Sequence, residues 1–174
     1  RDRVSYVVAI VQLLLQGIGD GSQPLMSFYL GIGKPELAGK VRNMAYIFAV
    51  SVALANAATL YLLREMIPGF FGASGLVSSI VAGSLPVFSL GFIFIAFCRT
   101  TTSYFYATKR NLFSYVMVYG EPVVLCLLLF FGLPPVMELY GVWLSVPLTQ
   151  AVLAAAGMAL LRKEQSLCSN YVAE

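Results

Sequence analysis

Long apolar runs separated by short polar breaks dominate the chain. Five runs are long enough to cross a lipid bilayer as a helix, which takes about 20 mainly apolar residues. They cover roughly residues 6–30, 44–63, 85–107, 112–133 and 139–161, and residues 76–84 form a short amphipathic lead into the third. Turn residues such as glycine and proline lie between the runs. The pattern predicts an all-α, polytopic membrane helix bundle of about five transmembrane helices.

Composition supports a lipid-facing surface and narrows the function. Of 174 residues, 59% are hydrophobic and 11% are charged, whereas soluble domains carry about 25% charged residues. The chain has no histidine, and its three cysteines fit no zinc or redox spacing. No metal site, cofactor, nucleic-acid partner or enzymatic activity is therefore expected.

Basic residues on the connections predict the orientation in the membrane. With five spans, one side receives seven of the eleven Lys and Arg residues: Lys34, Lys40, Arg42, Lys109, Arg110, Arg162 and Lys163. The other side receives Arg1, Arg3 and Arg64. Because cytoplasmic loops are enriched in positive charge, we expect a multi-pass cell-membrane protein with a cytoplasmic C-terminus. An external N-terminus without an evident signal peptide suggests a preceding helix, so we expect the chain to be part of a longer protein.

Ionisable residues within membrane spans are costly and are candidates for function by default. Asp20 lies between Gly17 and Pro24, in a stretch with three glycines and one proline. Such a stretch weakens a helix, and discontinuous helices form ion and substrate sites in transporters. Gln23 adds polarity nearby. The alternative is a kinked helix whose glycines allow close packing, with Asp20 facing water and binding no specific ligand.

Glu121 and Arg99 are the other two charges expected inside spans. A carboxyl group removed from water is a candidate for proton binding, which a proton-coupled carrier requires. We expect Arg99 to pair with Asp20 or with Glu121 across the bundle. The alternatives are a Glu121 held by a neighbouring group only to fix packing, and an Arg99 that extends to the interface or to cavity water.

Three sequence blocks, in this order, are similar to a known transporter family: Gly17-x-Gly19-x-Gly21-x-Gln23-Pro24-Leu25-x-Ser27-Phe28-Tyr29-x-Gly31-x-Gly33-Lys34, Ser103-Tyr104-Phe105-Tyr106-Ala107-Thr108-Lys109-Arg110 and Gly141-Val142-Trp143-Leu144-Ser145-Val146-Pro147. They resemble the multidrug and toxin extrusion (MATE) family, whose members have twelve helices in two six-helix lobes. The resemblance implies that residues 1–174 form the C-terminal lobe, from the eighth helix to the end, and that the N-terminal lobe is absent. The chain departs from the family at Tyr106, where glutamine is common, at Arg99, where an uncharged polar residue is usual, and at Glu121, near a frequent arginine.

The resemblance implies a secondary antiporter that exports organic, often cationic, compounds or drugs in exchange for H⁺ or Na⁺. Its partners would be a small-molecule substrate, the lipid bilayer and the N-terminal lobe. Asp20 and Glu121 are candidates for the cavity or for ion coupling, with Arg99 as their electrostatic partner. Gln23 is a further candidate for substrate binding or ion coupling, and Tyr29, Tyr104 and Tyr106 are candidates for cavity lining. Two alternatives stay open: a lipid-linked saccharide flippase of the same superfamily, and a transport-inactive membrane scaffold.

Overall fold

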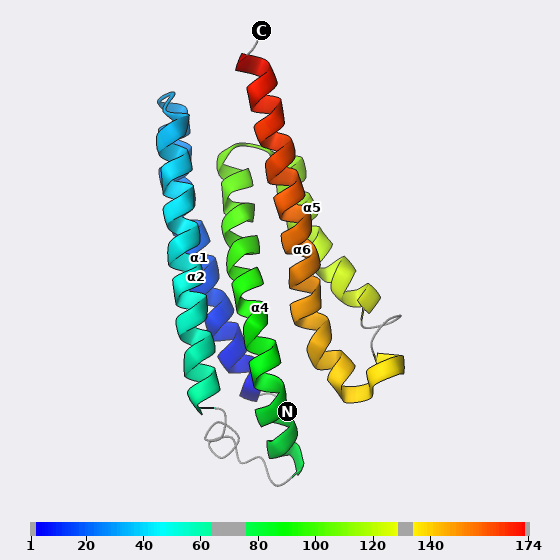
Figure 1. The fold of residues 1–174 in the computed structure, drawn as a ribbon. Coiled ribbons are helices and arrows are strands. Elements are labelled where there is room, and N and C mark those ends of the chain that lie inside the picture. Colours follow the sequence, from blue (N-terminus) through cyan, green and yellow to red (C-terminus); the bar gives the residue numbers. More distant parts are fainter. Residues whose placement is uncertain (1–2, 64–75, 129–133, 173–174) are drawn as a thin grey trace.

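Five helices make up the computed structural model of the chain in the part that it describes (Figure 1). It describes residues 3–63, 76–128 and 134–172, with side chains for residues 9–62, 89, 91–128 and 144–164. The helices are α1 (Arg3–Gly31), α2 (Pro35–Leu63), α4 (Leu76–Ala107), α5 (Asn111–Leu127) and α6 (Pro134–Val172). The predicted all-α bundle is confirmed.

The helices differ from the predicted spans mainly in where they begin and end. Residues 35–43 belong to α2, and residues 76–84 belong to α4 rather than forming a separate lead. α6 starts at Pro134, and proline is favoured in the first turn because its missing N–H would have no partner there. The last predicted residues of the fourth span, 129–133, lie outside the described residues. Helices therefore extend beyond the apolar runs, into sequence that hydropathy alone does not mark as helical.

Two tight turns of the same type join α1 to α2 and α4 to α5. At the first, the Lys34 N–H bonds to the Tyr29 carbonyl and the Gly33 N–H bonds to the Leu30 carbonyl, the pattern of a Schellman motif. Gly33 has a φ of 72°, which glycine adopts without steric cost. The second turn repeats this pattern, but Lys109 takes the positive φ, 58°.

α4 is the central helix of the bundle. It packs against α1 and α2 on one side and against α5 and α6 on the other, and these two pairs also pack internally. In the view of Figure 1, α1 lies behind α2 and α5 lies behind α6. Small residues let the backbones approach: Gly91 of α4 lies against Pro147 of α6, and Gly157 of α6 lies against Met117 of α5.

The apolar core has two parts, one on each side of α4. The first joins α1, α2 and α4, with Leu15, Ala53, Phe92, Ile95 and Ala96 among its buried members. The second joins α4, α5 and α6 around Phe105, Met117 and Leu153. The two parts position α1 and α5 as neighbours of one central helix, which brings polar residues from separate elements into one region.

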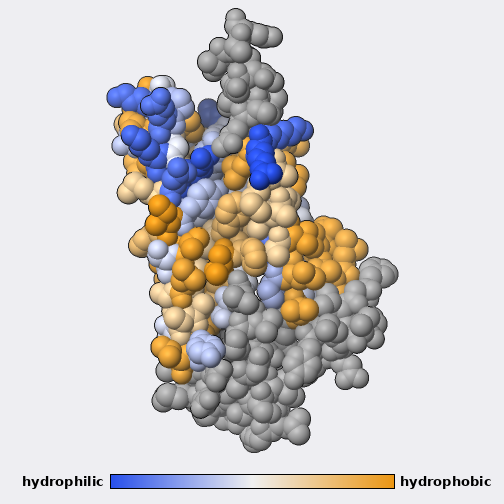
Figure 2. Space-filling view, viewed as in Figure 1, coloured by the Kyte–Doolittle hydropathy of each residue, from blue (hydrophilic) through white to orange (hydrophobic). Residues whose placement is uncertain are grey.

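Large apolar side chains cover much of the outer surface, as lipid contact requires. Leu62 is 78% exposed, Leu112 is 77% exposed and Met44 is 69% exposed. Figure 2 shows this apolar surface over the middle of the described part. By length and hydropathy alone, Pro35–Leu62 and Leu144–Glu164 qualify as membrane spans among the described residues, and Asn111–Leu127 is apolar but shorter. Soluble proteins rarely expose apolar surface on this scale, so the bundle is built for a membrane.

Basic residues gather at one end of the bundle. The α1–α2 turn, the α4–α5 turn and the stretch of α6 near Arg162 all lie at this end (Figure 1). Figure 2 shows hydrophilic residues concentrated there. The seven basic residues assigned to one side by the sequence therefore share one end of the molecule. The side chains of the three assigned to the other side, Arg1, Arg3 and Arg64, lie outside the described residues.

Candidate functional site

Polar residues of α1 form a stripe along one face of the helix. Gln12, Gln16, Asp20, Gln23 and Ser27 recur at steps of three or four residues, which places them on one side of a helix. Asp20 is exposed, and its carboxylate has no ion-pair or hydrogen-bond partner among the described residues. Gln23 is half-buried, one turn further along.

The expectation of a discontinuous first helix is wrong, because α1 runs unbroken through Pro24. Proline removes only one N–H donor, and packing against α2 and α4 stabilises the rest of the helix. The Ser22 hydroxyl donates to the Gly19 carbonyl at 2.8 Å, within the same stretch. The site that this stretch offers is therefore a side-chain carboxylate on a continuous helix, rather than the end of a broken one.

Gly19 fixes the level at which α1 meets α4. A Cβ at this position would lie 2.7 Å from the Ser103 Oγ and 3.2 Å from the Arg99 carbonyl oxygen. By contrast, a Cβ at Gly17 or Gly21 would meet nothing within 4 Å. Of the three neighbouring glycines, Gly19 alone is required for close approach. It places Asp20, the next residue, beside the turn of α4 that carries Arg99.

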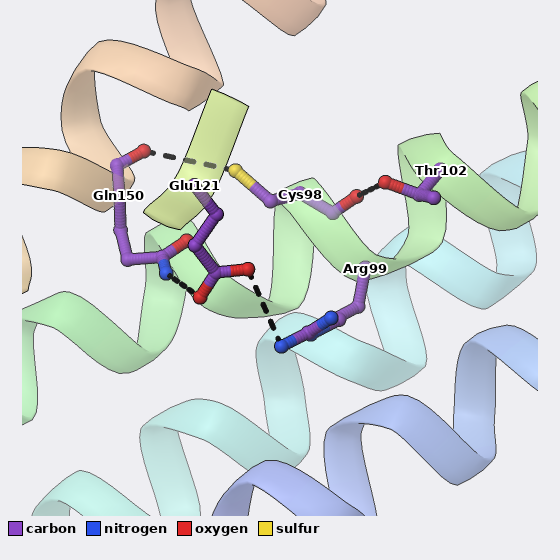
Figure 3. A network of polar contacts seen from close by, with 5 residues as sticks. All are labelled: Cys98, Arg99, Thr102, Glu121 and Gln150. Atoms are coloured by element: carbon purple, nitrogen blue, oxygen red, sulfur yellow. Dashed lines mark hydrogen bonds and ion pairs between the residues drawn. The ribbon is translucent and has the colours of Figure 1, made fainter. Parts of the chain in front are cut away.

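Arg99 and Glu121 form an ion pair between α4 and α5 (Figure 3). The Arg99 Nη2 lies 3.5 Å from the Glu121 Oε2. The Gln150 Nε2 of α6 donates to the other carboxylate oxygen, Oε1, at 2.7 Å. Of the two partners that the sequence offers Arg99, the structure selects Glu121, and a glutamine from a third helix completes the arrangement.

This Arg99–Glu121–Gln150 network lies at the edge of the core, where its charges keep some contact with the surroundings. The side chains of Arg99 and Glu121 are 29% and 27% exposed, whereas Gln150 is buried. Cys98 is also buried and places its thiol 3.6 Å from the Gln150 carbonyl, a weak contact. A buried or half-buried charge is tolerated in a membrane bundle when it is paired, and both Glu121 oxygens have partners here.

The threonines after Arg99 add little free hydrogen-bonding capacity. Thr100, Thr101 and Thr102 each donate to the carbonyl four residues earlier, at 2.9, 2.7 and 2.8 Å. This back-bonding satisfies a hydroxyl within its own helix. Thr101 also shares a 2.8 Å hydrogen bond with the Tyr46 hydroxyl of α2. The polar run of α4 therefore contributes mainly the Arg99 charge to the site.

The structure separates the tyrosines that the sequence suggests as cavity lining. Tyr106 is 39% exposed and lies seven residues from Arg99, on the same face of α4. Tyr104 faces a different neighbour, because the Arg42 guanidinium of α2 lies 4.8 Å from the centre of its ring. Tyr29 is half-buried and makes an edge contact with Phe28. Of the three tyrosines, Tyr106 shares a helix face with Arg99, about 10 Å further along α4.

A second polar cluster lies at the basic end of the bundle and was not foreseen from the sequence. Glu164 of α6 is 5% exposed, and its Oε1 lies 4.0 Å from the Arg110 Nε. The Thr108 hydroxyl donates to the Tyr104 carbonyl at 3.1 Å close by, and the Arg42 guanidinium lies over the Tyr104 ring. The cluster ties α2, α4 and α6 together near the α4–α5 turn, which indicates a structural role.

Sequence reasoning also missed Gln150. Gln150 is uncharged, so the cost of an ionisable group does not mark it, although an amide within an apolar run is itself a signal of interhelical hydrogen bonding. Ser145, Thr149 and Gln150 are all buried, so the polar side of α6 faces the bundle. Among the described residues, no group of three His, Cys, Asp or Glu side chains could hold a metal ion. The chemistry of this region therefore rests on charge pairing and hydrogen bonding.

Comparison with known proteins places these features in a family. No curated protein and no solved structure matches the chain significantly. The sequence model of the MatE family matches residues 4–131, well over half of the 174-residue chain. This range includes Asp20, Arg99 and Glu121. The chain belongs to the multidrug and toxin extrusion (MatE) family of membrane transporters.

Proposed function

We propose that the chain is the C-terminal lobe of a secondary antiporter that exports organic, often cationic, compounds in exchange for H⁺ or Na⁺. The observation that carries the proposal is the state of Asp20. Its carboxylate is exposed and unpartnered among the described residues, at the level of the bundle where Arg99 and Glu121 neutralise each other. An unpaired carboxylate on a polar helix face is suited to binding a cation.

The polar stripe of α1 supports the presence of a second lobe. Glutamine and aspartate side chains are costly against lipid, so this stripe is expected to face protein or a water-filled cavity. The large exposed apolar residues of α1 outside the stripe, such as Leu14 and Phe28, suit lipid contact. A cavity between two lobes would satisfy both faces, and rocking of the lobes would give alternating access. The basic end of the bundle, including the C-terminus, would then be cytoplasmic.

The charge balance of the site favours organic cations over lipid-linked saccharides. A flippase for pyrophosphate-bearing substrates needs unpaired positive charges in its cavity. Among the described helices, Arg99 is the basic residue at this level of the bundle. It already forms an ion pair with Glu121. Asp20 adds a negative charge, so the three residues together carry a net charge of −1. We therefore rank the flippase, and the inactive scaffold, below the antiporter.

The test is cation exchange in proteoliposomes that contain the full-length transporter. An outward gradient of an organic cation should drive H⁺ or Na⁺ movement, and Asp20→Asn should abolish it without loss of folded protein. Glu36→Gln is the matched control, because Glu36 is also exposed but lies in the first turn of α2, near the turn to α1. Absence of exchange in the parent, with any cation and ion tried, would refute the antiporter.

A further inference from the structure

Three charged residues on three helices meet at one level of the bundle. α1 contributes Asp20, α4 contributes Arg99 and α5 contributes Glu121. α1 and α5 both pack against α4 (Figure 1), and Arg99 extends from α4 to its partner on α5. The close contact of Gly19 with the Arg99 backbone sets α1 at the same turn of α4. The two acids therefore lie on two different helices that pack against α4 near the level of Arg99.

Only one of the two carboxylates engages Arg99. Glu121 is held in place by Gln150, which donates to the oxygen that Arg99 does not contact. Asp20 has no such support from a described residue. Both Glu121 oxygens thus have partners, whereas neither Asp20 oxygen has one in the part of the chain that the structure describes. This difference in hydrogen bonding and ion pairing indicates that Glu121 and Asp20 have different roles.

We propose that Glu121 is a positioning residue: together with Gln150 it holds Arg99 away from Asp20, so that Asp20 can bind a singly charged cation. The inference deepens the proposed function and rests on it for the identity of the cargo. The ligand chemistry is a single positive charge, which a proton, a sodium ion or an organic cation supplies. Arg99 is the internal competitor for the same carboxylate.

The long side chain of arginine makes this competition possible. The guanidinium is always charged and ends a flexible stem, so it needs a carboxylate partner wherever it lies at low dielectric. When Glu121 loses its charge, Asp20 is the remaining acid at this level on a described helix. Arg99 then turns to Asp20 and blocks it. Transport would fail although Asp20 itself is intact.

The first test is a set of charge variants in the exchange assay on the full-length transporter. Glu121→Gln should reduce exchange by about tenfold or more, because the freed arginine captures Asp20. The double variant Arg99→Gln/Glu121→Gln should recover to within about threefold of the parent, because the competitor is gone. Asp20→Asn should be inactive in every background. A double variant as inactive as Glu121→Gln would overturn the inference and assign cation binding to Glu121 itself.

A second measurement reads the pairing of Asp20 without any transport, so it separates this inference from the proposed function. A hydrophobic carbodiimide adds to the protonated form of membrane carboxyl groups, and an ion pair with a basic side chain disfavours that form. Mass spectrometry reports labelling of the peptide with Asp20. Labelling should be high in the parent, several-fold lower in Glu121→Gln, and restored in the double variant. Equal labelling in all three proteins would overturn the inference, even if the parent transports.

If Glu121→Gln does not yield folded protein, Gln150→Leu replaces it. This variant keeps both charges of the pair and removes only the amide that fixes Glu121. Partial release of Arg99 should lower Asp20 labelling by an intermediate amount, and Arg99→Gln should reverse the decrease. Unchanged labelling in Gln150→Leu would count against the positioning role.

Discussion

The face of α1 around Asp20 and the junction of α4, α5 and α6 around Glu121 show how neighbours divide the roles of two similar acids. Each region has a carboxylate in a helix of the membrane bundle. Glu121 has an arginine and a glutamine on its two oxygens, whereas Asp20 is exposed and has no partner among the described residues. A charged residue inside a span can thus form a structural ion pair or remain available to bind a ligand. The neighbouring side chains determine which of the two roles it has.

The packing around the two acids differs in the same way. Gly120 precedes Glu121 and lies against Leu153 of α6, so the acid is carried on a helix that packs closely on two others. Asp20 follows Gly19, the contact with α4, but its own side chain points away from the core. Stability should therefore depend on the Glu121 region and cation binding on the Asp20 region. The following variants test that division.

The largest loss of stability is expected for Arg99→Gln. Removal of one partner of a buried pair costs about 3–5 kcal/mol. The side chains of this pair are 29% and 27% exposed, which lowers the expected cost to about 2 kcal/mol. Thermal unfolding of the detergent-solubilised transporter measures the change. The double variant Arg99→Gln/Glu121→Gln should be more stable than Arg99→Gln, because no carboxylate is left unpaired. Additive losses in the double variant would mean that the pair contributes no coupling energy.

Gly19→Ala is expected to cost about 1.5 kcal/mol, because the higher helix propensity of alanine offsets part of the usual cost of overpacking. The new methyl group would meet the Arg99 carbonyl at 3.2 Å, a backbone atom that cannot move aside freely. Gly17→Ala is the matched control, since its methyl group would meet nothing within 4 Å. The same unfolding assay should show a clear loss for the first variant and none for the second. Equal effects would show that α1 does not approach α4 at Gly19.

Gln150→Leu is expected to cost about 1 kcal/mol, the typical net value of a hydrogen bond between membrane helices. Leucine keeps most of the volume but leaves Glu121 Oε1 without its donor. The Arg99–Glu121 pair remains, so the loss should be smaller than for Arg99→Gln. A loss as large as that of Arg99→Gln would show that Gln150, rather than the ion pair, holds the junction together.

Sequence predicted the helices well because membrane spans are long apolar runs, and it predicted the partners only in part. The sequence marks the charged residues as candidates because a charge inside a membrane span is energetically costly. Which carboxylate pairs with Arg99 depends instead on how the helices are arranged around α4. Gln150 lies 29 residues beyond Glu121, a separation that no local pattern reveals. The prediction of a broken first helix was wrong because helix propensity takes no account of tertiary packing. Contacts with α2 and α4 stabilise α1 as a continuous helix through Pro24. Glu164 adjoins two basic residues, Arg162 and Lys163, so the local sequence does not distinguish it from a solvated charged helix end.

Asp20→Asn should leave the free energy of unfolding within about 0.5 kcal/mol of the parent, as for other surface substitutions. The amide is nearly the same size as the carboxylate, and no described partner is lost. Exchange should nevertheless disappear, so the smallest effect on stability should accompany the largest effect on transport. Arg99→Gln should show the opposite balance, because it damages packing but leaves Asp20 uncovered. If Asp20→Asn instead unfolds the protein, then Asp20 has a structural partner and the division between the two regions fails.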